Sequence, residues 1–130
     1  MAHRFPLRVY YEDTDLAGIV YYANYLKFIE RGRTEALREA GVDQNRLKDE
    51  RGIVFVVVRV TADWRRPAVF DDLLTVETRL ARLGGASVDM AQRVLRGGET
   101  LFEAEVRMAC MGRDGRAARL PADLRAALQG

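Results

Sequence analysis

The stretch that decides the fold is residues 11–25, which read YEDTDLAGIVYYANY. Just before it, residues 5–11 alternate apolar and polar side chains with the period of a β-strand, and continuing that alternation places Asp13 and Asp15 near the strand's end. After a short turn, residues 22–40 follow the 3.6-residue period of an amphipathic helix. The sequence therefore predicts two carboxylates close to a helix N-terminus.

The predicted helix has one apolar face and ends at Gly41, a good C-terminal stop. The apolar face consists of Tyr25, Phe28, Ile29, Gly32, Ala36, Leu37 and Ala40. The opposite face is charged and is expected to point away from the core, with Lys27, Arg31, Arg33, Glu35, Arg38 and Glu39. Gly32 in mid-helix costs about 1 kcal/mol relative to alanine. It either allows a close approach between helix and sheet or is simply tolerated, and the sequence favours neither explanation.

Four strands are predicted after the helix, at residues 53–66, 73–83, 86–95 and 100–111. Pro67 ends the first of them, and glycine pairs after the second and third indicate hairpins. Residues 42–52 form a short helix or a loop, and the C-terminal piece, 123–128, is either helical or irregular. One long helix beside a largely antiparallel sheet is an α+β arrangement. With 130 residues, the chain is expected to form a single domain over residues 1–130.

The first strand after the helix lacks alternation, because residues 53–58 read IVFVVV. A strand with one face toward water alternates apolar and polar side chains, so a continuous apolar run indicates that something covers both faces. A second subunit is the simplest cover.

The composition of the chain limits the classes of protein to which it can belong. The chain is 48% hydrophobic and 31% charged, and no apolar run approaches the ~18 residues of a membrane span. Its first residues, MAHRFP, lack the apolar core of a signal peptide, so a cytoplasmic protein is expected. Cys110 and His3 are the only residues of their types, which leaves almost no ligands for a transition metal, and we expect no metal site. Cys110, in an apolar strand, is expected to be a buried thiol.

The basic residues are unusual in kind but not clustered. Only Lys27 and Lys48 among the 21 basic residues are lysines, and the net charge is +2. Arginine forks suit phosphate recognition. No cluster is dense enough to indicate nucleic-acid binding, which is therefore not expected.

The segment before the helix can perform carbonyl chemistry. The first amides of a helix have no intrahelical acceptor and lie at the positive end of its dipole, so the Tyr22 amide can hydrogen-bond a developing oxyanion. Asp15, across a turn that contains Gly18, can lie beside the same carbonyl carbon as base or nucleophile. A thioester fits a weak carboxylate base because its thiolate leaves readily. Aspartates before helices are more often caps or turn formers, and Asp13 is expected to be one.

The wider pattern resembles a known family. It comprises VYYEDTD at residues 9–15, GIVY at 18–21, NY at 24–25 and ERGRTE at 30–35, and it continues through PA at 67–68 and DDLLTVET at 71–78. This pattern is similar to that of the YbgC-like acyl-CoA thioesterases, which belong with the 4-hydroxybenzoyl-CoA thioesterases in the hotdog-fold superfamily. The resemblance covers nearly the whole chain. It implies a long central helix wrapped by a curved antiparallel sheet of about five strands, paired edge to edge in a homodimer or homotetramer with active sites at the interface.

The resemblance also assigns residues. It implies that Asp15 is the catalytic carboxylate, that the Tyr22 amide is the oxyanion donor, and that no cofactor is needed beyond the coenzyme A of the substrate. Tyr22 stands where close YbgC relatives carry histidine, which puts substrate preference in question. Tyr11 matches a tyrosine associated with the site, although core packing is its more ordinary role. Further substrate-binding candidates are Gly18 and Val20 and, for the coenzyme A phosphates, the arginines Arg59, Arg65, Arg66, Arg82 and Arg93.

The sequence thus predicts an acyl-CoA thioesterase that releases free acid from a small or medium acyl-CoA. Two alternatives remain open. One is a hotdog dehydratase, which would need a histidine paired with an acid, whereas His3 precedes the first strand. The other is a non-catalytic module that binds acyl-CoA or an acyl-carrier protein, and the tyrosine at position 22 keeps it open.

Overall fold

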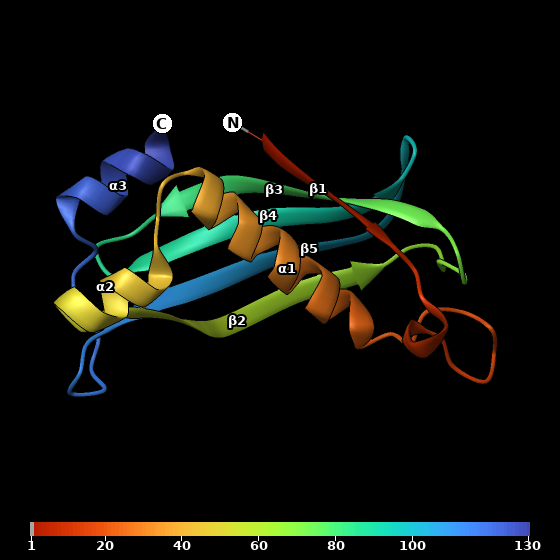
Figure 1. The fold of residues 1–130 in the computed structure, drawn as a ribbon, viewed down its shortest axis with the longest axis horizontal. Helices are drawn as coiled ribbons and strands as arrows, with labels where there is room; N and C mark the ends of the chain where they lie inside the picture. The colour runs from red at the N-terminus through yellow and green to blue at the C-terminus, as the bar shows by residue number, and fades with distance from the viewer. Residues whose placement is uncertain (1) are drawn as a thin grey trace.

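The computed structural model describes residues 2–130 and shows one long helix, α1 (Asn24–Glu39), lying across a single antiparallel sheet (Figure 1). The five strands are arranged in the order β1-β3-β4-β5-β2. Their bounds are β1 Ala2–Arg8, β2 Val54–Trp64, β3 Leu73–Leu83, β4 Ser87–Arg96 and β5 Glu99–Met111. The expected α+β architecture is confirmed, because one helix packs on one face of a five-stranded sheet.

Three short helical elements complete the chain: the one-turn 3₁₀ helix η1 (Tyr11–Asp13), α2 (Gln44–Arg51) and α3 (Ala122–Gln129). In Figure 1, α2 and α3 lie at one end of the molecule, and the loops that lead into α1 lie at the other. The Asp43 side chain caps α2 by accepting from the Arg46 amide at 3.0 Å. The two segments whose structure the sequence left open are therefore both helical.

The core lies between α1 and the sheet. Phe28, Ile29 and Leu37 on α1 are almost fully buried, as are the sheet residues Val76 and Phe102. Burial of such side chains contributes roughly 1.5–3 kcal/mol each. The apolar helix face predicted from periodicity is therefore the face that packs.

Gly32 lies where α1 packs closely against β3. A Cβ built on it would lie 2.4 Å from Cγ1 of Val76 and 2.9 Å from its Cβ. No side chain fits without displacing β3 or the helix. Close approach, rather than tolerance, therefore explains this glycine.

Two expectations about local structure were wrong. β1 ends at Arg8, and a 3₁₀ turn over Tyr11–Asp13 replaces the continued strand. The chain bends there because Asp13 Oδ2 accepts from the Tyr10 amide at 2.8 Å, which closes the turn on itself. Helix α1 begins at Asn24, within two residues of its predicted start, after a tight turn closed by the Asn24 amide and the Tyr21 carbonyl.

The second wrong expectation concerns Arg33, which does not face away from the core. It is 8% exposed and donates to Gln92 Oε1 at 3.0 Å, and burial lowers the pKa of its guanidinium. The Gln92 amide donates in turn to the Ile29 carbonyl and to Thr78 Oγ1, at 2.8 and 2.9 Å. A period-based assignment misses such a residue because a long arginine stem can turn back under its own helix.

The outer edge of β2 has no partner strand within the chain, since β2 pairs only with β5. Its apolar residues Val57, Val58 and Val60 are 43%, 58% and 40% exposed. A bulge interrupts the pairing between Val57 and Arg59. The second cover expected for residues 53–58 is therefore not supplied by residues 2–130.

No helix within residues 2–130 has both the length and the apolar character needed to cross a bilayer.

Candidate active site

A cleft of about 360 Å³ opens where three segments meet, and Asp15 lies in its wall. The segments are the turn that carries Asp15, the entry to α1 and the C-terminal end of β2. The lining residues are Asp15, Ile19, Val20, Tyr21, Tyr22, Tyr25, Trp64, Arg65, Arg66 and Pro67. The fold thus brings Asp15 and Tyr22 into one cleft, as the sequence predicted.

Asp15 has two functions in the local structure. Its Oδ1 accepts from the Ala17 amide at 2.9 Å, and its carbonyl accepts from the Gly18 amide at 2.9 Å, so it forms a turn of the kind aspartates often form. Gly18 adopts a φ of +81°, a conformation that glycine tolerates best. The other oxygen, Oδ2, has no hydrogen-bond partner among residues 2–130. One oxygen therefore fixes the carboxylate while the second is available to a substrate or a water molecule.

Asp13 is structural, as expected of a turn former. Besides closing η1 with its side chain, it accepts through its carbonyl from the Tyr21 amide at 2.9 Å and from Asn24 Nδ2 at 3.0 Å. These two bonds anchor the entry to α1 onto the Asp13–Asp15 segment. They set the separation between Asp15 and the first amides of the helix.

The Tyr22 amide lies in the turn immediately before α1 and, in the part of the chain that the structure describes, its N–H remains free to bind a ligand. The neighbouring amides of Tyr21 and Asn24 donate to Asp13 and Tyr21 carbonyls at 2.9 and 2.8 Å. The hydrogen bonds found in residues 2–130 include none donated by Tyr22 N. A free N–H at the positive end of a helix dipole is suited to stabilise an oxyanion.

Aromatic side chains form one wall of the cleft. The Tyr22 ring lies 5.9 Å from the Trp64 ring, which meets the buried Phe102 edge to face at 5.1 Å. Tyr25 stacks on Phe102 at 5.1 Å, and its hydroxyl accepts from the Ala68 amide at 3.0 Å. Burial raises the pKa of Tyr25, which keeps its hydroxyl neutral. Sequence reasoning missed Trp64, although an aromatic residue shortly before Pro67 was an available signal.

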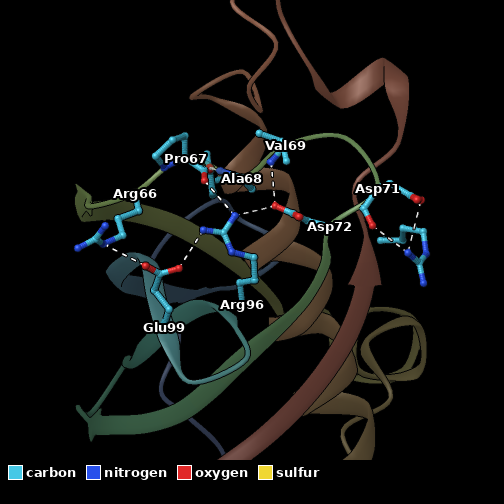
Figure 2. A network of polar contacts seen from close by, with 10 residues as sticks. Arg66, Pro67, Ala68, Val69, Asp71, Asp72, Arg96 and Glu99 are labelled. Carbon is cyan, nitrogen blue, oxygen red and sulfur yellow. Dashed lines mark hydrogen bonds and ion pairs between the residues drawn. The ribbon is translucent and has the colours of Figure 1, made fainter.

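Residues 65–67 line the other wall, and an ion-pair network supports the segment 66–72 that continues from it (Figure 2). The Arg96 guanidinium donates to Asp72 Oδ2 at 2.8 Å, to Glu99 Oε1 at 2.9 Å and to the Pro67 carbonyl at 3.3 Å. Asp72 Oδ2 also accepts from the Val69 amide at 2.9 Å. Burial alone would raise the pKa of Asp72, but the Val69 amide and the Arg96 guanidinium outweigh it and lower the pKa below its ordinary value. No local sequence pattern marked Arg96.

The structure divides the predicted arginines into two groups. Arg65 and Arg66 lie at the cleft, paired with Glu103 at 2.5 Å and Glu99 at 3.1 Å. Arg59, by contrast, lines a separate depression with Asp89 and Arg107. Arg82 pairs in register with Asp89, and Arg93 is bound to Glu77 at 2.7 Å. Within one chain, these three do not join Asp15.

Tyr11 is not where the sequence placed it. It is 82% exposed and contacts Phe70 edge to face at 6.5 Å, so core packing is wrong for this residue. It does not line the cleft either. The 3₁₀ turn that ends the strand early swings it outward. Val20, by contrast, is 2% exposed and lines the cleft, and Gly18 shapes the turn beside it.

Comparisons with known proteins agree with this geometry. The family model described as the thioesterase-like superfamily matches residues 9–128. The chain is 46% identical over 107 residues to the acyl-CoA thioesterase YbgC of Haemophilus influenzae, a match that covers 82% of this chain and 79% of that protein.

Two solved structures are similar throughout. A probable thioesterase from Bartonella henselae is 42% identical with a TM-score of 0.87, covering 93% of this chain and 100% of that one. A 4-hydroxybenzoyl CoA thioesterase complexed with 4-hydroxybenzoyl CoA is 26% identical with a TM-score of 0.90, covering 98% of each chain.

Proposed function

Because this chain belongs to the thioesterase-like superfamily, we propose that it hydrolyses a small or medium acyl-CoA thioester to a free acid and coenzyme A. Its membership confirms the hotdog fold and the likeness to YbgC-like thioesterases that the sequence predicted. The observation that carries the proposal is that Asp15, with an unpartnered Oδ2, and the free Tyr22 amide line the same cleft.

The proposed chemistry follows from these two groups. The thioester oxygen accepts from the Tyr22 N–H, and the carbonyl carbon faces Asp15. Asp15 either takes a proton from an attacking water or attacks the carbon itself, which gives a mixed anhydride that water then opens. In both routes the carbon–sulfur bond breaks and the thiolate leaves and is protonated. Because a carboxylate with a reference pKa of about 3.9 is a weak base, the rate depends mostly on positioning and oxyanion stabilisation.

The coenzyme A moiety needs cationic partners for its phosphates, and Arg65 and Arg66 are the guanidinium groups at the cleft. Their present partners, Glu103 and Glu99, lie in half-exposed ion pairs that a phosphate can replace at low cost. Arg59 and Arg82 would serve only a cleft completed by a second copy of the chain.

A second copy is also the cover that we propose for β2. The unpaired edge and the exposed Val57, Val58 and Val60 suit strand pairing with another β2. The cleft includes Trp64 and Arg65, at the end of the same strand. Pairing along this edge would therefore bring a neighbouring chain close to the cleft, in a homodimer or a homotetramer.

The non-catalytic alternative has one observation in its favour: Asp15 forms a turn through Oδ1 and so has a reason to be present without chemistry. Tight binding of acyl-CoA or an acyl-carrier protein without thiol release would support it. The dehydratase alternative lacks such support. His3 pairs with Glu39 at 3.0 Å, at the end of α1 opposite to Tyr22, and does not line the cleft.

The decisive test replaces Asp15 with asparagine and measures thiol release across short, medium and aromatic acyl-CoA substrates. The amide keeps the Oδ1 acceptor and removes the charge, so we expect kcat to fall by about 10²-fold or more while the protein stays folded. Glu12→Gln is the matched control, because it removes a neighbouring charge that does not line the cleft. Full turnover of Asp15→Asn on the best substrate would falsify the role of this carboxylate.

A further inference from the structure

We infer that Trp64 is a positioning residue, which holds the Tyr22 turn in the geometry that the reaction needs. Trp64 is the last residue of β2, and its indole Nε1–H donates to the Tyr22 carbonyl at 3.0 Å. The inference rests on the proposed function, because it takes the Tyr22 amide as the oxyanion donor. Trp64 acts through that amide and transfers no proton.

The Tyr22 carbonyl depends on the indole because α1 does not use it. In a helix that began earlier, the Leu26 amide would donate to this carbonyl, but it donates to the Ala23 carbonyl instead, at 3.1 Å. The indole is the one donor to Tyr22 O recorded among residues 2–130. The planar peptide couples the Tyr22 carbonyl rigidly to the Ala23 N–H, and only the two torsions at the Tyr22 Cα separate that plane from the Tyr22 N–H, so anchoring the carbonyl limits how the Tyr22 amide can turn.

Trp64 is anchored well enough to serve as a fixed donor. It pairs across the sheet with Phe102, which is fully buried, and the two rings meet edge to face at 5.1 Å and 68°. Phe102 in turn stacks on Tyr25 at 5.1 Å, with an angle of 20° between the rings. The indole is therefore connected to the core through an aromatic stack, although 46% of Trp64 is exposed at the cleft.

The turn has supports on one side that cannot replace this bond. The Tyr21 amide and Asn24 Nδ2 both donate to the Asp13 carbonyl, so they tie the turn to the segment that bears Asp15. Among residues 2–130, the one hydrogen bond that ties this turn to β2 comes from the Trp64 indole. Without it, we expect the Tyr22 amide to sample orientations away from the substrate oxygen. Misaligned oxyanion donors and small positional errors lower turnover by about 10- to 100-fold.

The sequence allows a sharp experiment, because Trp64 is the only tryptophan of the chain. A host that cannot make tryptophan, fed β-benzothienylalanine, would produce full chains in which sulfur replaces the indole N–H and ring size is nearly unchanged. A preparation fed 5-fluorotryptophan keeps the N–H and supplies the reference. Thiol release is measured on both with the acyl-CoA that the unlabelled enzyme hydrolyses fastest.

We expect kcat of the benzothienyl protein to be about 10- to 100-fold below the reference, with KM within about threefold and an unchanged melting temperature. In ¹⁵N spectra, the Tyr22 and Ala23 amide signals should move while those of α3 stay in place. Equal kcat in the two preparations would overturn the inference, and so would a fall in kcat matched by a large drop in melting temperature or by unmoved Tyr22 and Ala23 signals.

Failure of the inference is distinguishable from failure of the proposed function. If the two preparations turn over equally and Asp15→Asn is inactive, the thioesterase proposal stands and the role of Trp64 is rejected. If the unlabelled enzyme releases no thiol from any acyl-CoA, the proposed function fails and the inference falls with it.

Discussion

The two walls of the cleft differ in the interactions that hold them in place. On the side of Asp15, backbone hydrogen bonds hold the chain: Tyr21 N to Asp13 O and Gly18 N to Asp15 O, both at 2.9 Å. On the opposite side, backbone hydrogen bonds also hold residues 65–72, such as Arg65 N to Leu101 O at 2.8 Å, but ion pairs are added to them, with Arg96 bound to Asp72 at 2.8 Å. Among residues 2–130, the second wall alone adds guanidinium–carboxylate pairs to its backbone hydrogen bonds. The two groups proposed to react, the Asp15 carboxylate and the Tyr22 amide, lie on the wall without those ion pairs.

Arg96→Met should have the largest effect on stability, because it removes the centre of the charged wall. Asp72, whose side chain is 18% exposed, would lose its guanidinium partner, and the Pro67 carbonyl would lose a donor. We expect the free energy of unfolding to fall by about 1–3 kcal/mol and KM to rise more than kcat falls. Denaturant unfolding and thiol-release kinetics measure both.

Arg46→Met is its matched control, since it breaks an exposed pair with Glu50 on α2 that is worth about 0–1 kcal/mol. Equal losses of stability in the two variants would contradict a special role for the Arg96 network.

Gly18→Ala tests the other wall and should have a smaller effect. No atom lies within 4 Å of the added Cβ, so the cost comes from a φ of +81° alone and is about 1 kcal/mol. Because the Asp15 turn must shift to relieve that strain, we expect kcat to fall severalfold with KM nearly unchanged. Gly98→Ala, at an open position without a positive φ, is the control. A Gly18→Ala enzyme with normal kcat would show that the turn tolerates the strain.

The pH dependence of unfolding should be the smallest effect. It distinguishes the wall that contains Asp72 from the wall that contains Gly18. The pKa of Asp72 is lowered in the folded protein, so its contribution to stability is fully present above its unfolded value near 3.8 and is lost as the pH falls through the folded pKa. Denaturant unfolding across the acid range should show a shallower loss of stability for Asp72→Asn than for the parent protein. Gly18→Ala should keep the parent's slope. Identical acid slopes for the parent and Asp72→Asn would contradict this assignment.

Much of the fold follows from periodicity. Helix α1 and strands β3, β4 and β5 lie within a few residues of their predicted bounds, because each has a strong local pattern and glycine-bearing turns between them. The close approach of α1 explains Gly32, which the sequence alone left undecided. The buried position of Arg33 could not be predicted, because it depends on where Gln92 lies across the sheet.

The site was predictable only where it is local. Asp15 and the Tyr22 amide are seven residues apart and lie in two successive turns, so their meeting was expected. Trp64 reaches Tyr22 from 42 residues away, and no short-range pattern announces that contact. The prediction for Tyr11 was wrong because the alternating pattern of a strand continues through this residue, whereas the Asp13 side chain closes the segment into a turn.

The valine-rich edge of β2 also has a consequence for handling the protein. Residues 53–58, IVFVVV, combine strong β-propensity with no charge and no proline, and the strand edge that carries most of them is unpaired within the chain. Such a segment is a template for cross-β stacking whenever it is left uncovered. At an unchanged protein concentration, a substitution that blocks the proposed β2 pairing should therefore promote fibrils or precipitation.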